Sequence, residues 1–286
     1  MHKQLEYPIA APTSRRRRVL DVREIRVVDP VAIGDVVELL GAGANAGIIT
    51  KILPRKNQIT RRDVGPKPLE QIIAANVDYI VHVVAAAQPA SKWELVDRYL
   101  ASAELAEIPS LIVLAKSDLL QDDAALAEAE NFRRIGYPVI LTSAMTGQGI
   151  YELRNALRDK LSVFVGMSGV GKSTLLNALQ PELALRVKQI SAATGKGIHT
   201  TTQLEMFDFD FGGRGVDTPG LKYLTLWKLA GAAVAEHFIE MRAYLGQCKF
   251  GADCSHDHEP DCAVKRAVGQ GRISERRYRS YLHIKG

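Results

Sequence analysis

The sequence has no apolar run of about 18 residues, the length a helix needs to span a bilayer, so we expect no transmembrane segment. Residues 1–18 also lack the apolar centre of a secretory signal. Cysteine is scarce: 3 cysteines, all within residues 248–262, cannot form a closed disulfide framework and instead favour a reducing compartment and a metal site. These absences predict a protein of the cytoplasm without a membrane partner.

The residues that are present fit a globular chain of roughly two domains. Of the 286 residues, 47% are hydrophobic and 24% are charged. The formal net charge of +5 is compatible with a nucleic-acid partner but is weak evidence by itself. The run from Arg15 to Arg18 is either a solvated basic arm or a contact to RNA.

The pattern divides the chain into three segments. Residues 1–66 hold the basic arm and short strand-like runs, which predict a small all-β barrel or sandwich such as an OB-fold. Residues 67–228 alternate apolar runs with helical patterns, as in a parallel α/β sheet, and residues 229–286 are helical and basic. The apolar runs expected to be strands are YIVHVVAA (79–86), SLIVLA (110–115), PVILTSA (138–144), LSVFVG (161–166) and FDFDF (207–211).

A glycine-rich loop, GMSGVGKST, follows the fourth of these runs and precedes an amphipathic helix. This is the pattern G-x-x-x-x-G-K-[ST] in the context of strand, loop and helix, whose backbone N–H groups cradle phosphates. We expect Lys172 to reach the β- and γ-phosphates and Ser173 to ligate Mg²⁺. The predicted phosphate-binding residues are Gly166, Met167, Ser168, Gly169, Val170, Gly171, Lys172, Ser173 and Thr174.

The residues that select the base lie before this loop rather than after it. Guanine is read by a carboxylate two residues after a lysine, and Lys116-Ser117-Asp118 is the single K-x-D triplet in the chain. It follows the run SLIVLA, at the edge where open α/β sheets bind ligands. About 25 residues on, Thr142-Ser143-Ala144 resembles a loop that contacts the guanine O6, so Ser143 and Ala144 join the predicted site. The order of motifs is therefore rotated.

Two further motifs follow the phosphate loop. GKGIHTTT (195–202) offers Thr200 and Thr201 to complete Mg²⁺ coordination, with Thr201 expected as the ligand and Thr202 as an alternative. DTPG (217–220) offers Asp217 for the outer shell of the metal and Gly220 for the γ-phosphate.

The cysteines form the pattern C-x5-C-x-H-x5-C. Cys248, Cys254, His256 and Cys262 make a Cys3His set, which is common in tetrahedral structural zinc sites. His258 competes as the fourth ligand, and the alternative is three buried thiols beside a surface histidine. In a segment with little core, one zinc ion would supply most of the folding free energy.

The last predicted helix has two possible roles. Its aromatic and basic residues form either a face packed on the metal site or a surface that grips phosphates. The residues concerned are Arg276, Arg277, Tyr278, Arg279 and Tyr281.

Taken together, these motifs resemble the RsgA family of circularly permuted GTPases, which act in small ribosomal subunit maturation. The resemblance covers roughly residues 20–283 and includes GDVV, ILPRKNQITRR, DRYL, GMSGVGKSTLLNAL, GIHTTT, DTPG and the cysteine-rich tail. It implies an N-terminal OB-fold, a permuted GTPase domain and a C-terminal zinc domain with His256 as the ligand. It also implies a GTPase that is stimulated by the small subunit, binds its rRNA, uses Mg²⁺ with GTP, and acts as a monomer.

Two departures from the family pattern stand out. Position 115 is alanine where the family usually has asparagine. We expect this change to cost ~1–3 kcal/mol of nucleotide affinity, while Asp118 keeps the specificity for guanine. The run Gly-Gly-Arg-Gly before Asp217 weakens an expected strand.

The expected mechanism assigns water activation to a histidine. Leu221 follows the DTPG motif and cannot orient a nucleophile, whereas His199 resembles the family's proposed catalytic histidine. We expect His199 and Lys172 to be the catalytic residues, and hydrolysis to be slow without the ribosome. The alternative is a GTP-gated RNA-binding module in which Ala115 has removed useful turnover.

Overall fold

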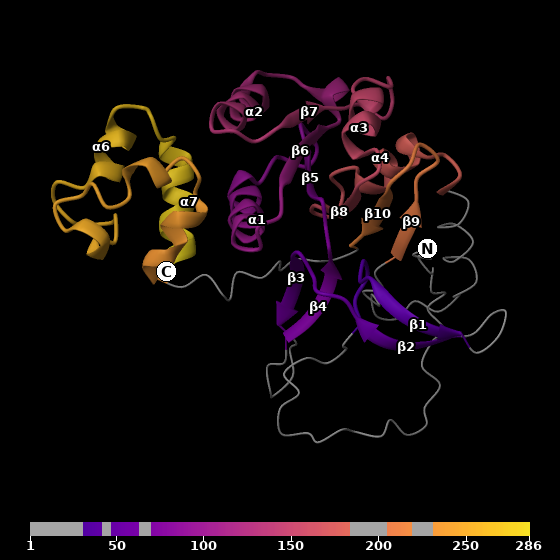
Figure 1. Ribbon diagram of the computed structural model, residues 1–286. Coiled ribbons are helices and arrows are strands. Elements are labelled where there is room, and N and C mark those ends of the chain that lie inside the picture. The colour runs from indigo at the N-terminus through magenta and orange to yellow at the C-terminus, as the bar shows by residue number, and fades with distance from the viewer. Residues whose placement is uncertain (1–30, 42–46, 63–69, 184–204, 219–230) are drawn as a thin grey trace. The chain divides into compact units, whose positions relative to one another are not determined.

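The computed structural model of the protein describes residues 31–41, 47–62, 70–183, 205–218 and 231–286 (Figure 1). The chain forms two compact units, residues 1–76 and 77–286. Among the described helices, none combines the length and the apolar character that crossing a membrane requires.

The described part of the first unit is built from strands. They are β1 (Val37–Gly41), β2 (Gly47–Ile52), β3 (Gln58–Arg62) and β4 (Glu70–Ala75), and they pair antiparallel as β1–β2 and β3–β4. The Arg55 guanidinium donates to both carboxylate oxygens of buried Asp35, at 2.6 and 2.7 Å. This bidentate pair joins the GDVV and ILPRKNQITRR motifs. The described residues are all-β as predicted, but they do not by themselves close a barrel.

The second unit is an α/β sheet followed by a helical segment. Its strands are β5 (Tyr79–Ala85), β6 (Ser110–Ala115), β7 (Val139–Leu141), β8 (Leu161–Val165), β9 (Glu205–Asp208) and β10 (Arg214–Asp217). Its helices are α1 (Trp93–Leu105), η1 (Ser117–Leu119), α2 (Ala124–Arg134), α3 (Ile150–Leu157), α4 (Lys172–Leu179), η2 (Gly231–His237), η3 (Arg242–Tyr244), η4 (Gly251–Asp253), α6 (Ala263–Gly269) and α7 (Glu275–Lys285), where η marks a 3₁₀ helix.

The sheet is mixed rather than purely parallel. Its strand order is β7-β6-β5-β8-β10-β9, with β9 alone antiparallel to its neighbour. The reason is the turn at Gly212 and Gly213, which both have positive φ and let the chain fold back directly from β9 into β10. The glycine run therefore makes a hairpin, and the short strand β10 forms beside β8 despite its glycine content.

Helices cover both faces of the sheet, as Figure 1 shows, because its central strands are apolar on both sides. On β6, Leu111 and Val113 pack with residues of α3 and α4, whereas Ile112 and Leu114 pack with residues of α1 and α2. Successive residues of a strand point to opposite faces, so one continuous apolar run serves two cores.

The C-terminal helical segment packs on α1. Ala101 of α1 lies in one buried cluster with Phe238 and Tyr281. Beside this cluster, buried Arg277 of α7 pairs with Asp97 of α1 at 2.8 Å and with Glu240 at 2.6 Å. Since both carboxylates are also buried, removing one partner would leave a charge without compensation.

Candidate nucleotide site and metal site

The carboxyl ends of the five parallel strands meet at one edge of the sheet, and the predicted nucleotide motifs follow these ends. The triplet 116–118 follows β6, the loop 142–148 follows β7, the phosphate loop 166–171 follows β8, and residues 217–218 end β10 or follow it. Motifs far apart in the sequence thus come to the edge where ligands of open α/β sheets bind.

The phosphate loop carries its lysine at the start of α4. Lys172 Nζ lies 2.9 Å from Asp217 Oδ1 and donates to the Thr218 carbonyl at 3.1 Å. The Thr218 hydroxyl in turn donates to the carbonyl of Phe164 in β8 at 2.6 Å. The structure therefore brings the phosphate-loop lysine and the DTPG aspartate together. Ser173 and Thr174 are exposed in the first turn of the same helix.

The lysine of the base-reading triplet reaches across to the phosphate loop. Lys116 has left-handed backbone geometry with φ 61°, and its Nζ donates to the Gly169 carbonyl at 2.7 Å and to the Gln88 carbonyl at 2.5 Å. Its stem passes beside Gly171. Asp118 is exposed on the 3₁₀ turn that follows. Lys116 therefore ties the end of β6 to the phosphate loop.

The loop 142–148 is closed by its own hydrogen bonds. The Ser143 hydroxyl accepts from the backbone N–H groups of Met145 and Thr146, and the Ser143 N–H donates to the Gln148 carbonyl at 3.0 Å. Ser143 is buried, and Ala144 is half-buried. A preformed loop of this kind can present backbone donors to a ligand without ordering first.

Four predicted nucleotide-site residues lie outside the described residues. They are His199, Thr200, Thr201 and Gly220. Thr202, the alternative magnesium ligand, also falls in this part of the chain.

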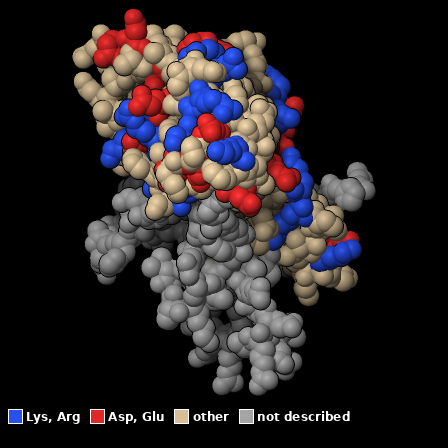
Figure 2. Space-filling model, turned by 90° about the vertical axis from the view of Figure 1, so that its left-hand side faces the viewer, with Lys and Arg blue, Asp and Glu red and all other residues tan. Residues whose placement is uncertain are grey.

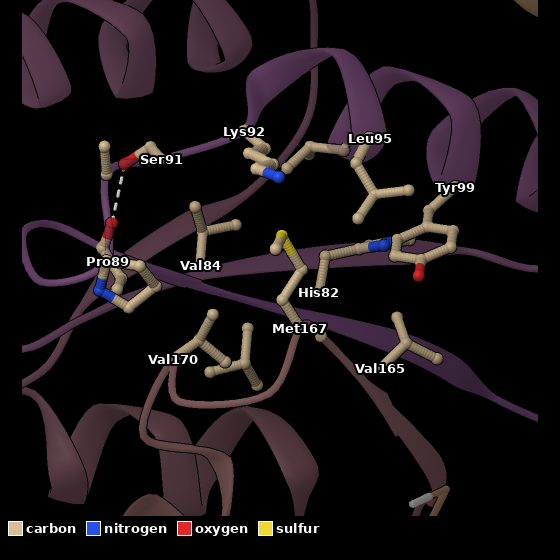
Figure 3. A pocket seen from close by; sticks show the side chains of 15 residues that line it. His82, Val84, Pro89, Ser91, Lys92, Leu95, Tyr99, Val165, Met167 and Val170 are labelled. Atoms are coloured by element: carbon tan, nitrogen blue, oxygen red, sulfur yellow. Dashed lines mark hydrogen bonds between the residues drawn. The ribbon is translucent and has the colours of Figure 1, made fainter. Parts of the chain in front are cut away.

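A small pocket lies under the phosphate loop, between β5 and α1 (Figure 3). Its volume of about 20 Å³ holds little more than one water-sized group, so it cannot hold a nucleotide. His82 extends towards the Tyr99 ring, with ring centroids 6.2 Å apart, and its Nε2 lies 2.9 Å from the Ser110 hydroxyl. Burial lowers the pKa of His82 to about 3. His82 is a neutral core residue, which agrees with its place in an apolar strand.

The predicted metal ligands converge in the C-terminal segment. Cys248, Cys254, His256 and Cys262 are all buried, and their ligand atoms lie within 4.8 Å of one another. The sulfurs of Cys248 and Cys262 are 3.7 Å apart, and each lies 3.4–3.5 Å from His256 Nδ1. A tetrahedral zinc ion with bonds of ~2.3 Å requires sulfurs about 3.8 Å apart, so these separations fit. His256, and not His258, joins the cluster.

The chain around the cluster supports thiolate ligands. The backbone N–H of Ala263 donates to Cys248 Sγ at 3.3 Å, and that of Lys265 donates to Cys262 Sγ at 3.5 Å. Hydrogen bonds of this kind orient metal ligands and stabilise their charged form.

The last helix, α7, packs on the metal loop, which answers the question that the sequence left open. Tyr278 and Tyr281 donate their hydroxyls to the carbonyls of His256 and Ser255, at 2.7 and 2.6 Å. Arg276 binds Asp97 and Glu128 rather than facing solvent. The tyrosines and two of the arginines are therefore structural, while Arg279 is exposed.

Sequence reasoning did not single out the buried ion pairs or the residues that hold the base-reading loop. Glu240, Gln88 and Gln148 belong to none of the motifs. The one available signal was DRYL, in which Asp97 is a charged residue on the apolar stripe of a helix.

The fold and this edge of the sheet define the class of protein: a nucleotide-binding α/β protein of the P-loop type, with the base-reading loop ahead of the phosphate loop. The model of the RsgA GTPase family matches residues 52–227.

Curated relatives and solved structures agree with the family model. The relative in Sodalis glossinidius, a small ribosomal subunit biogenesis GTPase RsgA, is 44% identical over 84% of this chain and 70% of its own. The relative of the same name in Azotobacter vinelandii is 43% identical over 88% of this chain and 73% of its own. The crystal structure of YjeQ from Thermotoga maritima matches with a TM-score of 0.71 and 35% identity over 89% of this chain and 83% of its own. The crystal structure of YloQ, a circularly permuted GTPase, matches with a TM-score of 0.67 and 33% identity over 87% of this chain and 78% of its own. This chain belongs to the RsgA GTPase family, and it is a circularly permuted GTPase.

Proposed function

We propose that this chain binds GTP at the carboxyl edge of its sheet, hydrolyses it to GDP, and acts in late maturation of the small ribosomal subunit. The observation that carries the proposal is the contact of Lys116 with the phosphate loop, because it joins the base-reading and phosphate-binding motifs into one site. The names of the curated relatives support the ribosomal role. Stimulated hydrolysis then drives release from the subunit.

We assign the role of each phosphate-binding residue from its position in the motifs. The phosphate loop, 166–174, holds the phosphates through its backbone N–H groups, and Lys172 binds the β- and γ-phosphates. Ser173 and Thr201 would hold Mg²⁺ with support from Asp217, and the ion would neutralise charge on the phosphates. Since Lys172 is paired with Asp217 in this structure, phosphate binding must exchange that ion pair for contacts to the nucleotide.

The guanine base is read at the neighbouring loops. The Asp118 carboxylate accepts the guanine N1–H and 2-amino groups, while Ser143 and Ala144 present backbone N–H groups to the O6. Ala115 supplies no polar group to this site. His199 orients the attacking water when the small subunit is bound.

The flanking segments hold the protein on its RNA. We propose an OB-fold domain in residues 1–66, the GTPase domain in 67–228, and a domain in 229–286 held by one structural zinc ion on the Cys3His cluster. The protein would then work as a cytoplasmic monomer. On the face seen in Figure 2, Lys and Arg lie among Asp and Glu, so contacts to rRNA there depend on separate cations rather than on one broad basic patch.

A nucleotide titration tests the base assignment. GDP and GTP should compete with a fluorescent guanine nucleotide, and ATP should not, because adenine presents an acceptor at N1 and lacks the 2-amino donor. Equal affinity for ATP and GTP would overturn the assignment.

Turnover separates the GTPase from a binding module. Release of phosphate should be slow for the protein alone and should rise when small subunits are added. If the subunits bind but the rate does not change, the GTP-gated RNA-binding module with little turnover becomes the better account.

A further inference from the structure

The base-reading loop lacks the side-chain amide that its motif normally provides. Ala115 is the last residue of β6, and its methyl group is buried in the core beside α3 and α4. It can neither donate nor accept a hydrogen bond through its side chain, so other groups must fix the turn that carries Asp118.

Lys116 accounts for one side of this turn, through its bonds to the carbonyls of Gly169 and Gln88. The other side is tied to the loop 142–148. The Ser117 N–H donates to the Thr142 carbonyl at 3.0 Å, and the Ser117 hydroxyl donates to Gln148 Oε1 at 2.8 Å. The second bond joins two side chains, and nothing in the family motif requires either of them.

Gln148 is well placed to hold this bond. Its own backbone is fixed, since its carbonyl accepts from the Ser143 N–H at 3.0 Å and its N–H donates to the Thr146 hydroxyl at 3.4 Å. Its side chain is nevertheless largely exposed and contributes little to the core. A glutamine of this kind can be changed without disturbing the packing of the sheet.

We propose that the bond between Ser117 and Gln148 is a positioning device for guanine recognition that compensates for Ala115. Ser117 directly precedes Asp118 on the same short 3₁₀ turn, so any shift of Ser117 moves the carboxylate. Asp118 must meet two donors of guanine at once, and a bidentate contact tolerates little displacement. The proposal rests on the proposed function, because it assumes that Asp118 reads the base.

The test is a double-mutant cycle in nucleotide affinity, using Ser117→Ala, Gln148→Ala and the double variant. GDP and inosine diphosphate, which lacks the 2-amino group, compete with a fluorescent guanine nucleotide for each protein. Each single variant should bind GDP about 3- to 10-fold more weakly. The loss for inosine diphosphate should be smaller, because one of the two contacts is already absent. The double variant should be no weaker than the singles.

Three further variants serve as controls. Ser117→Thr keeps the hydroxyl and should restore GDP affinity. Gln247→Ala removes another exposed glutamine whose amide donates to a carbonyl, and it should match the unmodified protein. In an Ala115→Asn background, where the amide is restored, the cost of Ser117→Ala should shrink.

The outcomes distinguish a failure of the Ser117–Gln148 proposal from a failure of the proposed guanine site. If the unmodified protein binds ATP and GDP with equal affinity, the assignment of the base-reading loop itself fails. If it prefers GDP but Gln148→Ala does not weaken GDP binding, only the bridge is wrong. Equal losses for GDP and inosine diphosphate, or additive losses in the double variant, would also overturn the bridge, since they indicate a general loosening.

Discussion

Asp118 lies on an exposed turn directly after two anchored residues, Lys116 and Ser117, so its backbone is held while its carboxylate is exposed to a ligand. This arrangement ties nucleotide choice to one side chain. A carboxylate accepts from two donors of guanine, whereas an amide in its place offers one donor and one acceptor.

Asp118→Asn should therefore shift the preference from guanine to xanthine nucleotides, because xanthine carries a carbonyl where guanine carries the 2-amino group. We expect GDP affinity to fall by about 1.5–3 kcal/mol, the value of a charge-assisted hydrogen bond. Competition titrations with GDP and xanthosine diphosphate measure the shift. Asp123→Asn, four residues from the turn's end at Leu119, is the matched control and should keep the guanine preference. An unchanged preference in Asp118→Asn would exclude this carboxylate as the base reader.

His82 makes the free energy of unfolding depend on pH. Its pKa is about 3 in the folded state and ~6.5 when unfolded. Between these values the unfolded chain binds more protons, so the free energy of unfolding falls as the pH falls, by up to ~1.4 kcal/mol per pH unit.

Replacing the imidazole by an uncharged group removes this contribution. The difference in unfolding free energy between the unmodified protein and His82→Gln should shrink by about 2 kcal/mol from pH 7.5 to pH 5, as urea denaturation measures it. His283→Gln, an exposed change on α7, is the matched control for the substitution itself. Parallel curves for the unmodified protein and His82→Gln would mean that His82 binds a proton as readily in the folded state as in the unfolded state.

At the scale of elements, α7 contributes both to the metal loop and to the packing on α1. Two arginines on this helix, two residues apart, differ sharply in environment. The Arg277 side chain is 2% exposed and paired with Asp97 and Glu240, whereas the Arg279 side chain is 66% exposed and paired with exposed Glu275.

Arg277→Ala should therefore lower the free energy of unfolding by about 3–5 kcal/mol, because it removes the ion-pair partner of buried Glu240 and leaves buried Asp97 with Arg276 alone. Arg279→Ala is the matched control on the same helix and should cost less than about 1 kcal/mol. The midpoints of urea denaturation give both values. Similar losses in the two variants would contradict the buried ion-pair network.

In the metal loop, a predicted zinc ligand can be compared with a nearby histidine outside the cluster. Cys254→Ala should lose a bound zinc ion and destabilise residues 229–286, since ligand binding and folding are coupled in such segments. His258→Ala should retain about one zinc ion per chain, because His258 lies outside the cluster of ligand atoms. Elemental analysis of purified protein measures both. Absence of zinc from the unmodified protein would refute the Cys3His assignment. Loss of zinc from His258→Ala would show that His258, and not His256, is the fourth ligand.

Periodicity and motifs anticipate most elements of the sheet and much of the site. β5, β6 and β8 follow from continuous apolar runs, and the phosphate loop and Cys3His cluster follow from spacing. β10 does not, because Arg-Gly-Val-Asp has little strand propensity and is held by its neighbours β8 and β9. The pairings of Arg277 could not be assigned from the sequence either, since its partners Glu240 and Asp97 lie 37 and 180 residues away. Pairings of that range depend on tertiary packing alone.

At the scale of the whole molecule, the rotated order changes what each motif is joined to. The base-reading strands β5 to β7 follow the first unit, while β10 and the DTPG motif lead into the C-terminal segment. A nucleotide that engages both halves can therefore influence the segments at either end, and such coupling is reciprocal between nucleotide and RNA.

Small-subunit binding should accordingly be tighter with a non-hydrolysable GTP analogue than with GDP, by about 5- to 150-fold for a typical coupling. Sedimentation with purified subunits measures this ratio. Lys172→Ala should abolish the dependence on nucleotide, because the γ-phosphate loses its main cation. His199→Ala should keep it and lose the stimulated hydrolysis instead. Identical sedimentation in the GTP-analogue, GDP and nucleotide-free states would indicate a constitutive RNA-binding protein.

The position of β5 also matters during synthesis. β5 is one of the two central strands, with β6 on one side and β8 on the other. β8 begins at Leu161, more than seventy residues after β5 ends at Ala85. A nascent chain can pair β5 with β6 and β7 early, but one edge of an almost wholly buried, apolar strand stays open until the phosphate-loop strand leaves the ribosome. If translation pauses or stops before β8 is made, the nascent chain therefore exposes an unpaired, apolar strand edge that can pair with other chains. Such incomplete chains should need chaperones or aggregate.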